Sequence, residues 1–596
     1  MRRTRWIPYA AVTLAAIILY LPTVRFEYVL DDLHLIVNNT FLREPWSPLT
    51  AFAHHFWHGT IFQEAYYRPI VTSSFALNGL VFGWGPAGFH LVNVLLHALN
   101  AALVLALARR LGNPVWAAAC AALLFALHPA AAWPVGSIVA RVDLLPGLFV
   151  LLAWLAWTAP PSSQARQAAV AFFFLLAILS KETGLAFLSV PLLALRRKDQ
   201  WRARRPVLAS LAAALAGCLV LRRVVGIPAL LSRGLIDPLI NPLATLPAAE
   251  RVRAALALSG RYLLYLVAPV RFSDPRNYFD AASIPPLLSP DVILPLLVLL
   301  GWGAGVAILW LRHDRVAIPL AFGLASFLPA SNIFFPITSL YALNFLYLPL
   351  IGLSLATGEW LGRISPRARF AVSRQDGQTV LELPKSVLFL TPLLGALALT
   401  SHIEVGIWRN AVSLFTAWTE RFPNYPPAQS SLGVALLDQH EPAVTGQDRA
   451  SWIEALEHLR RSMELAPTFA APAKVNASKA LLLLDRPDEA EAEAREGLQL
   501  SPDLMPARVN SAQSLYRQSR YGDAADQFAE LVRSNPTDVS VRSNYVVSLI
   551  HAGELDRAHS AASAAQRAFP GAAWFDFCLA RVEALRGHGS KALALL

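Results

Sequence analysis

The sequence predicts an all-α protein in two parts, a polytopic membrane domain of helices followed by an α-solenoid of paired helices. Three observations predict this fold class. Hydrophobic residues fill 55% of the 596 positions and charged residues only 15%, which is more apolar and less charged than soluble proteins usually are. Long apolar runs occupy residues 1–402, and a regular repeat occupies residues 403–596. We therefore expect two domains with these bounds.

The first apolar segment runs from Trp6 to Leu21, directly after Arg2, Arg3 and Arg5. No small-x-small cleavage site follows it, so we interpret it as an uncleaved anchor rather than a signal peptide. Basic residues before a span favour a cytoplasmic start. The sequence thus predicts a cytoplasmic N-terminus and an extracytoplasmic loop over residues 23–87.

Eleven segments are predicted to span the bilayer. They are residues 6–22, 88–108, 114–128, 143–158, 168–180, 184–195, 206–225, 291–311, 316–334, 341–360 and 385–402. Basic clusters follow the second, sixth, eighth and tenth segments, and they begin at Arg109, Arg196, Arg312 and Arg363. Because loops rich in Lys and Arg stay in the cytoplasm, all four clusters are placed there. The odd number of spans then puts the repeats outside the cytoplasm.

Two regions depart from simple spans. Counting Ala254–Val270 as a span would move the clusters around Arg312 and Arg367 to the wrong side, so we predict an interfacial or re-entrant helix there. The segments 168–180 and 184–195 are shorter than the roughly 20 residues that a span needs. We predict a short hairpin, whose turn Ser180–Gly184 lines a wet cavity where charged groups are tolerated.

The repeat has the tetratricopeptide period. Prolines and alanines recur at spacings of 34 or 35 residues, at Pro467, Pro502, Pro536 and Pro570 and at Ala490, Ala524, Ala558 and Ala592. In such repeats a small residue lets two antiparallel helices pack closely, and proline ends the second helix. An earlier unit is expected to end near Pro423, with about ten residues inserted around 441–450.

Several kinds of chemistry find no support in the sequence. Cys120, Cys218 and Cys578 lack Cys or His neighbours at zinc-ligand spacing, so we expect no metal or redox centre and no cofactor, with a divalent cation left open. The net charge of +11 is spread over short loops, which argues against nucleic acid as a partner. The loop containing His54 and His58, with His55 between them, is interpreted as an interfacial aromatic loop rather than a metal site.

Two adjacent carboxylates, Asp31 and Asp32, follow the first span at the outer mouth of the membrane domain. At that place a carboxylate can act as a general base on a substrate that arrives from the bilayer. The alternative is that the pair forms a solvated turn or caps the next helix. The sequence alone leaves both interpretations open, and it does not say which of the two would be the base.

A series of short motifs runs along the whole chain. They are Asp31-Asp32, Tyr67-Arg68-Pro69, Phe89–His97, His128-Pro129, Arg141–Leu145, Lys181–Gly184, Ala330–Pro336, Leu346–Pro349 and Trp408-Arg409. In these motifs and their order the chain resembles the transmembrane and tetratricopeptide repeat-containing O-mannosyltransferases, a branch of the GT-C glycosyltransferases, and bacterial proteins of the same layout. The resemblance implies a GT-C-like membrane domain of about 11 helices and then the repeats.

The resemblance also implies an integral membrane glycosyltransferase. It would transfer a sugar such as mannose from a polyprenyl-phosphate donor to a hydroxyl acceptor on a protein, outside the cytoplasm. In a bacterium the membrane would be the inner one and the repeats would be periplasmic; elsewhere they would be lumenal. The implied residues are Asp31 or Asp32 as the base, Arg68, Arg141 and Lys181 at the donor phosphate, and Glu182, His128 and Asp143 in support.

Other interpretations remain beside this one. Lys181 and Glu182 would also suit a mutually paired turn, and His128 and Arg141 would suit structural hydrogen bonds. The chain departs from the family pattern at Trp133, where relatives carry an acid, and at Leu343-Asn344, where they carry Glu-Arg. The main alternative function is a non-catalytic membrane scaffold for protein interactions. A transporter would show two similar membrane halves, which this sequence lacks.

Overall fold

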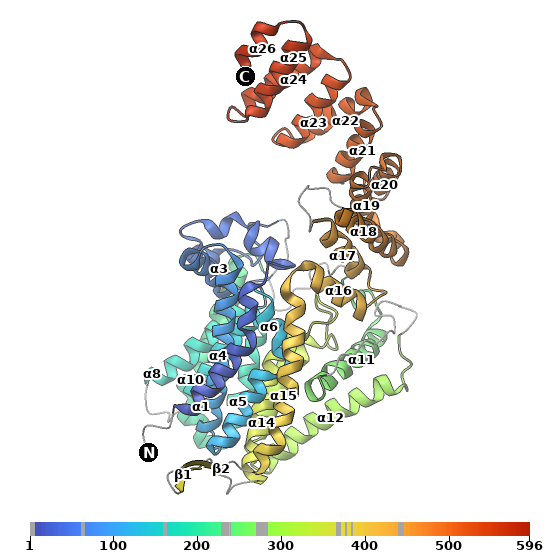
Figure 1. The fold of residues 1–596 in the computed structure, drawn as a ribbon. Coiled ribbons are helices and arrows are strands. Elements are labelled where there is room, and N and C mark those ends of the chain that lie inside the picture. The colour runs from blue at the N-terminus through green and yellow to red at the C-terminus, as the bar shows by residue number, and fades with distance from the viewer. Residues whose placement is uncertain are drawn as a thin grey trace. The chain divides into compact units, whose positions relative to one another are not determined.

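The structure is a computed structural model that describes residues 6–60, 66–158, 164–227, 236, 238, 240–269, 284–364, 371–375, 378–382, 385–438 and 446–596. The chain forms two compact units, which meet in sequence at Leu414 and Phe415 (Figure 1). The boundary predicted at residue 402 falls inside helix α15 (Lys385–Gly406). The basic residues at 2, 3 and 5, Arg367 and Arg369, and residues 441–445 of the expected insertion lie outside the described residues.

The predicted spans of the first unit coincide with helices. These are α1 (Ile7–Tyr20), α4 (Pro86–Arg110), α5 (Val115–Leu127), α7 (Arg141–Trp157), α8 (Gln164–Ser180), α10 (Lys198–Val224), α12 (Pro290–Leu311), α13 (Ala317–Phe327), α14 (Tyr347–Ile364) and α15, while the segment 184–195 forms η7 (Glu182–Leu188) and α9 (Ser189–Ala194). Within the described residues, six helices are long and apolar enough to cross a membrane, or seven if the pair Val115–Leu127 and Pro129–Gly136, bent by 52°, is one span. A multi-pass membrane domain follows, and the count of eleven stays a prediction.

Helix α4 lies in the middle of the first unit, where it packs against α1, α5 and α7. Its buried polar side chains hold the elements that carry the candidate site. Asn93 donates to the carbonyls of Ser137 and Ile138, just before α7. Asn100 donates to the Leu144 carbonyl in α7 and to the Tyr347 hydroxyl at the start of α14. Because an unpaired polar group is costly in an apolar interior, these bonds fix the relative positions of the helix ends.

The loop predicted between the first two spans is built largely of short helical segments. They are η2 (Leu21–Arg25), η3 (Leu33–Val37), η4 (Thr40–Arg43), α2 (Ser47–Thr50), η5 (Ala51–Ala53) and the longer α3 (Pro69–Phe82). Phe41, Phe56 and Phe75 of this region share one apolar core with Phe89 of α4 and Val142 of α7. This core seats the loop on the end of the helical bundle at which α7 begins.

The two irregular regions of the membrane domain are also helical. The predicted hairpin consists of α8, η7 and α9, and its turn is tight because a Cβ on Gly184 would come within 2.8 Å of the Ala177 backbone. Helix α11 (Ala248–Val267) buries one face and carries Arg251 and Arg253. It is not among the helices apolar enough to span a membrane, and its interfacial placement stays a prediction.

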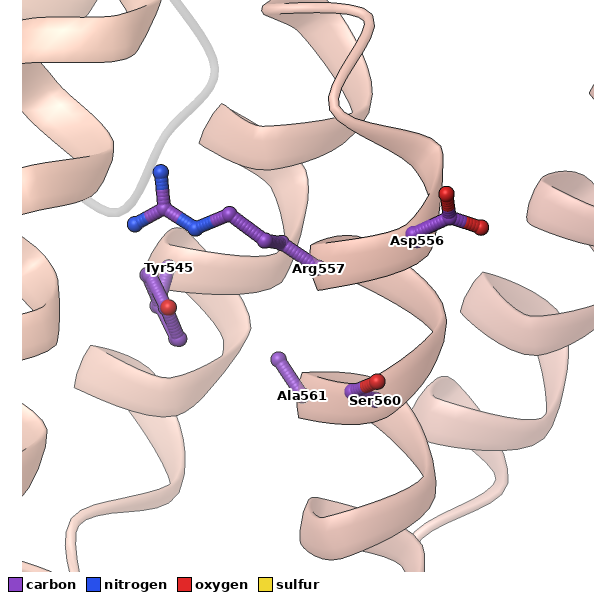
Figure 2. A pocket seen from close by; sticks show the side chains of 5 residues that line it. All are labelled: Tyr545, Asp556, Arg557, Ser560 and Ala561. Carbon is purple, nitrogen blue, oxygen red and sulfur yellow. The ribbon is translucent and has the colours of Figure 1, made fainter.

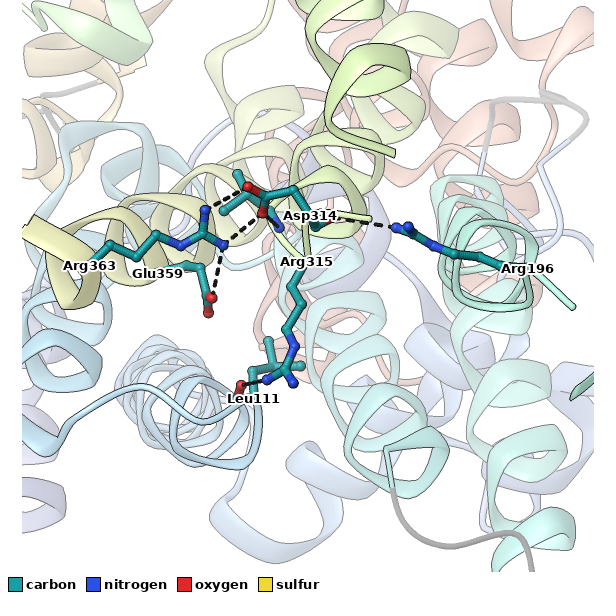
Figure 3. Close-up of polar contacts among 7 residues, drawn as sticks. Leu111, Arg196, Asp314, Arg315, Glu359 and Arg363 are labelled. Atoms are coloured by element: carbon teal, nitrogen blue, oxygen red, sulfur yellow. Dashed lines mark hydrogen bonds and ion pairs between the residues drawn. The ribbon is translucent and has the colours of Figure 1, made fainter. Parts of the chain in front are cut away.

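An ionic cluster joins several loops at the end of the bundle where α14 stops (Figure 3). Arg363 donates to both carboxylate oxygens of Asp314, at 2.6 and 2.7 Å, and to Glu359 at 3.2 Å. Arg196 donates to the Asp314 carbonyl, and Arg315 to that of Leu111. Since α14 has 18 residues and rises about 1.5 Å per residue, this cluster lies about 27 Å from the other end of the helix.

The remaining short elements of the first unit connect these helices. They are η6 (Pro129–Ala131), α6 (Ala132–Gly136), η8 (Pro242–Ala244), η10 (Leu328–Ala330), η11 (Leu343–Leu346) and η12 (Ile407–Arg409). A short hairpin departs from the all-α prediction: β1 (Ala371–Gln375) pairs antiparallel with β2 (Gln378–Glu382), with Ala371 opposite Glu382.

The second unit is a series of helix pairs, as the repeat predicts. Its helices are α16 (Ala411–Arg421), which begins in the first unit, α17 (Pro426–Asp438), α18 (Gly446–Leu465), α19 (Ala471–Leu483), α20 (Pro487–Leu500), α21 (Met505–Arg517), α22 (Tyr521–Ser534), α23 (Val539–His551), α24 (Leu555–Ala568), α25 (Ala573–Leu585) and α26 (Gly589–Leu595). A further turn, η13, covers Pro467–Phe469. The repeating prolines stand just after helices end, and the repeating alanines are buried, so the tetratricopeptide prediction is confirmed.

We expect Ala490→Leu to lower the free energy of unfolding of a purified fragment of residues 411–596. Ala490 is fully buried where α20 packs on α19, so added methyl groups would overpack the contact and cost about 1–3 kcal/mol. Ala492, exposed on the same helix, supplies the matched control, and Ala492→Leu should change the urea midpoint little. Equal losses in the two variants would contradict the predicted role of the alanine.

Candidate functional site

The two adjacent aspartates have different environments. Asp32 is fully buried and accepts two backbone hydrogen bonds, from the Val139 N–H at 2.9 Å and from the Val29 N–H at 3.2 Å. Asp31 is accessible to solvent. Leu30, with φ at +52°, makes the sharp turn before the pair. Asp32 therefore ties the loop after α1 to the start of α7, and the carboxylate of Asp31 remains available to a substrate.

Both carboxyl groups have raised pKa values. Burial raises the pKa of Asp32 to about 7, although its two backbone hydrogen bonds act in the opposite direction. Partial desolvation by the surrounding protein raises the pKa of Asp31, and the nearby charges of His34 and Arg68 oppose that rise. An aspartate with a raised pKa is a stronger base than usual when ionised, which suits general-base chemistry.

Arg68 connects Asp31 to a buried ionic network. The residue caps α3, and its guanidinium stacks on Tyr66, with 4.5 Å from Cζ to the ring centroid. One terminal nitrogen lies 3.6 Å from Glu182, whose other oxygen accepts from Arg222 at 3.1 Å. The Arg68 Nε is buried and has no partner. Arg68 thus retains hydrogen-bonding capacity toward a ligand.

A second ion pair lies next to the first in sequence and in space. The Lys181 Nζ lies 2.5 Å from Oδ1 of Asp143, and the other carboxylate oxygen of Asp143 accepts from the Asn344 amide at 2.7 Å. The Asn344 Oδ1 and the Thr183 Oγ1 are buried without partners, as is the Arg68 Nε. Unpartnered buried polar atoms are rare in proteins, and three around one ionic network mark a place that a polar ligand or water would occupy.

Arg141 has a different environment. It is fully buried, and Nε donates to Asn93, one terminal nitrogen to Ser74, and the other to Asn78 and the Phe89 carbonyl. The guanidinium also lies over the rings of Phe75 and Phe89. Protein acceptors use each of its nitrogens, so the geometry favours the structural interpretation of Arg141 over phosphate binding.

His128 also bonds within the protein. Its Nδ1 accepts from the Ala130 N–H, and its Nε2 lies 3.2 Å from the Leu266 carbonyl of α11, so it links two elements. In the histidine loop, the rings of His54 and His58 stack with centroids 3.7 Å apart, and Phe41 lies edge-on to both. The described residues contain no group of three His, Cys, Asp or Glu side chains that would hold a metal ion.

The structure brings together five of the predicted site residues, namely Asp31, Arg68, Asp143, Lys181 and Glu182. It places Arg141, His128 and Asp32 in structural bonds around them. The sequence analysis missed Arg222 and saw Asn344 only as a departure from a family pattern. Arg222 stands in α10, where an arginine in an otherwise apolar helix is a signal for a buried ionic partner.

The repeat unit has a pocket of its own, of about 360 Å³, lined by Tyr545, Asp556, Arg557, Ser560 and Ala561 (Figure 2). Arg557 is already paired with Asp526 and Glu554. Its charge is therefore compensated within the repeats, and the pocket is a weaker candidate for a charged ligand than the network around Arg68.

The comparisons with known proteins agree with the motifs. Protein O-mannosyl-transferase TMTC3 of Mus musculus is 25% identical over 578 residues, which cover 89% of this chain and 59% of that protein. The chain is similar over most of its length to protein O-mannosyl-transferases of the TMTC type. A second similar protein, protein O-mannosyl-transferase F38B6.6 of Caenorhabditis elegans, is 26% identical over 71% of this chain and 59% of its own length. Protein O-mannosyl-transferase Tmtc2 of Drosophila melanogaster is 39% identical over 24% of this chain and 16% of its own length.

The TMTC-like chain spans about 59% of the length of TMTC3 and of F38B6.6. No protein-family model matches it. Among solved structures, YrrB, described as a tetratricopeptide repeat protein with an unusual peptide-binding site, covers 31% of this chain and 90% of its own at 19% identity, with a TM-score of 0.26.

We expect Asp32→Asn to destabilise the protein and Asp31→Asn to leave its stability nearly unchanged. An asparagine at position 32 offers one acceptor oxygen for two buried N–H groups, so one of these loses its partner at a cost of about 1–3 kcal/mol. Thermal unfolding of the detergent-purified full chain measures the difference. A larger loss of stability in Asp31→Asn than in Asp32→Asn would contradict the assignment of roles.

Proposed function

We propose that this protein is an integral membrane glycosyltransferase that transfers a sugar, mannose by analogy with its relatives, from a polyprenyl-phosphate donor to a hydroxyl group of a protein. The observation that carries the proposal is the pairing of an accessible carboxylate, Asp31, with a nearby arginine, Arg68, that has an unpartnered buried nitrogen. A base beside a cation is what transfer from a phosphate leaving group requires.

In the proposed reaction, the acceptor oxygen forms a bond to the anomeric carbon while the bond from that carbon to the phosphate oxygen breaks. The phosphate leaves with the bonding electron pair, and Arg68 stabilises its developing charge. Asp31 takes the proton of the acceptor hydroxyl. Glu182, held by Arg222, orients Arg68, and the pair of Lys181 with Asp143 adds a fixed dipole beside it.

The arrangement of charges supports a site outside the cytoplasm. The basic residues Arg196, Arg315 and Arg363 gather at one end of the bundle (Figure 3). Asn344, which belongs to the candidate site, lies just before the other end of α14. Basic loops remain on the cytoplasmic side of membranes. The candidate site would then lie on the extracytoplasmic side, where the donor would reach Arg68 from the bilayer. The repeats would present the acceptor protein on that same side.

A non-catalytic scaffold is the second candidate, and one contact favours it. Trp133 stands where relatives carry an acid, and its ring packs on Trp408 with centroids 4.9 Å apart. A packed tryptophan cannot replace a carboxylate in proton transfer. In this alternative the repeats bind partner proteins and the membrane domain serves as their anchor.

The two candidates separate in a direct assay. The full chain, purified in detergent and mixed with radiolabelled polyprenyl-phosphate mannose and an acceptor protein, should yield labelled protein. Folded wild-type protein that transfers no label, from this donor or from polyprenyl-phosphate glucose, would refute the glycosyltransferase proposal in favour of the scaffold.

We expect Asp31→Asn to lower kcat by about 10² to 10⁴ while the donor KM changes little, because asparagine keeps the size but cannot accept the proton. In the wild type, kcat/KM should fall on acidification as Asp31 becomes protonated. Because the pKa of Asp31 is raised, the fall should begin at a higher pH than for an ordinary aspartate. A pH profile that is the same in wild type and Asp31→Asn would contradict its role as the base.

We expect Arg68→Gln to weaken donor binding and Arg141→Gln to weaken the fold. Loss of the Arg68 charge should raise the donor KM about ten- to a hundredfold with little loss of stability, since a hydrogen bond from a charged group to the phosphate disappears. Arg141→Gln should lower the free energy of unfolding by about 3 kcal/mol or more, because several buried acceptors lose their donor. Donor titrations and thermal unfolding of both variants measure these changes. A donor KM that rises only in Arg141→Gln would show that Arg141, and not Arg68, binds the donor phosphate.

A further inference from the structure

We infer that Trp408 is a positioning residue for Asp31. Its ring packs against Trp133 and Gly136 of α6, a site that we call the socket. From there it fixes both ends of the segment Glu27–Asp32, which we call the aspartate loop. Trp408 lies in η12, directly before the first repeat helix α16, and its side chain is 2% exposed. The expected effect on sugar transfer rests on the proposed function. The positioning of the Glu27–Asp32 segment by Trp408 rests on the contacts alone.

The socket is formed by α6 and the segment that follows it. The ring of Trp133 packs against Trp408, and a Cβ on Gly136 would come within 2.9 Å of the Trp408 ring. Position 136 must therefore be glycine for the tryptophan to be seated. Three residues beyond Gly136, the N–H of Val139 donates to Asp32. The first link thus runs from Trp408 through this segment to the residue next to Asp31.

The second link is direct. The carbonyl of Arg409, next to Trp408, accepts a hydrogen bond from the N–H of Glu27 at 2.9 Å. Glu27 precedes Asp31 by four residues, so the segment from Glu27 to Asp32 is held near one end by Arg409 and at the other by Val139. Arg409 lies in η12, and Val139 follows α6 by three residues. Trp408 packs η12 against α6, so it sets the positions of both hydrogen-bond partners.

Two hydrogen bonds join the first turn of α16 to η12. Asn410 accepts from the Ser413 N–H at 2.9 Å, which caps α16, and the Ser413 hydroxyl donates to the Ile407 carbonyl. These bonds fix the first turn of α16 to η12 beside Trp408.

The test uses the full chain in detergent with four variants. Trp408→Ala empties the socket, Gly136→Ala displaces the ring without removing it, and Trp408→Phe refills the socket with an aromatic ring. Trp360→Ala removes a tryptophan that is 57% exposed in α14, so it is the matched control. Hydrogen exchange of the peptide that covers Glu27–Leu33 is measured together with the kinetics of sugar transfer.

We expect exchange in Glu27–Leu33 to rise about tenfold in Trp408→Ala and in Gly136→Ala, and to stay unchanged in Trp360→Ala. The value of kcat should fall roughly 10- to 100-fold with the donor KM unchanged, since a small displacement of the base affects the chemical step more than binding. Trp408→Phe should restore most of both. A purely structural role would lower stability without this separation of kcat from KM.

Two results would overturn the inference. One is exchange in Glu27–Leu33 that matches the wild type in both Trp408→Ala and Gly136→Ala; if Trp408→Ala does not fold, Gly136→Ala alone decides. The other is a loss of turnover in Trp360→Ala equal to that in Trp408→Ala. Failure of the proposed function is a separate outcome, because wild-type protein would then transfer no sugar while the exchange comparison still tests the link between Trp408 and the aspartate loop.

Discussion

The candidate site depends on the two backbone hydrogen bonds that Asp32 accepts. The loop after α1 carries the only carboxylate of the pair that faces solvent, and this loop has no regular secondary structure between Arg25 and Asp31 to hold it. A buried carboxylate that accepts hydrogen bonds from the N–H groups of Val29 and Val139 fixes the loop to the segment just before α7. Desolvation makes this arrangement costly, and the N–H partners offset that cost.

The charged groups near Asp31 belong to one ionic network. Arg68 and Arg222 pair with Glu182, and Lys181 pairs with Asp143, while the charges of Arg68 and His34 act on Asp31. A phosphodiester that enters this network adds a negative charge, which raises the pKa of Asp31 further because like charges disfavour ionisation. Donor binding and base strength are thus coupled. Asn344 donates a hydrogen bond to Asp143 and contributes no charge here.

Much of the fold could be predicted from the sequence, because apolar runs and a 34-residue period are local signals. Ten of the eleven predicted spans overlap one α-helix each, and the segment 184–195 forms η7 and α9. The repeating prolines stand just after helix ends, and the repeating alanines are buried. The β-hairpin and the short helices after α1 were not predicted. The short helices are fixed by contacts with residues distant in the chain, since Phe41 shares one apolar core with Phe89 and Val142, and no periodicity records such contacts.

The site could be predicted only in part, for a physical reason. A charged residue in a membrane protein indicates that its side chain faces either a wet cavity or a polar partner. The sequence does not say which of these two it faces. Arg68 and Arg141 look alike in the sequence. In the structure one retains a free nitrogen, and the other is enclosed by Asn93, Asn78 and the Phe89 carbonyl. The division of labour between Asp31 and Asp32 likewise depends on the N–H of Val139, 107 residues away in the chain.

The most direct test of this account is a cryo-EM structure of the protein with a non-transferable polyprenyl-phosphate sugar. We predict that the phosphate lies within hydrogen-bonding distance of the Arg68 guanidinium, with the anomeric carbon facing Asp31. A phosphate bound elsewhere in the membrane domain, with Arg68 still in contact with Glu182, Tyr66 and Phe56, would contradict this prediction.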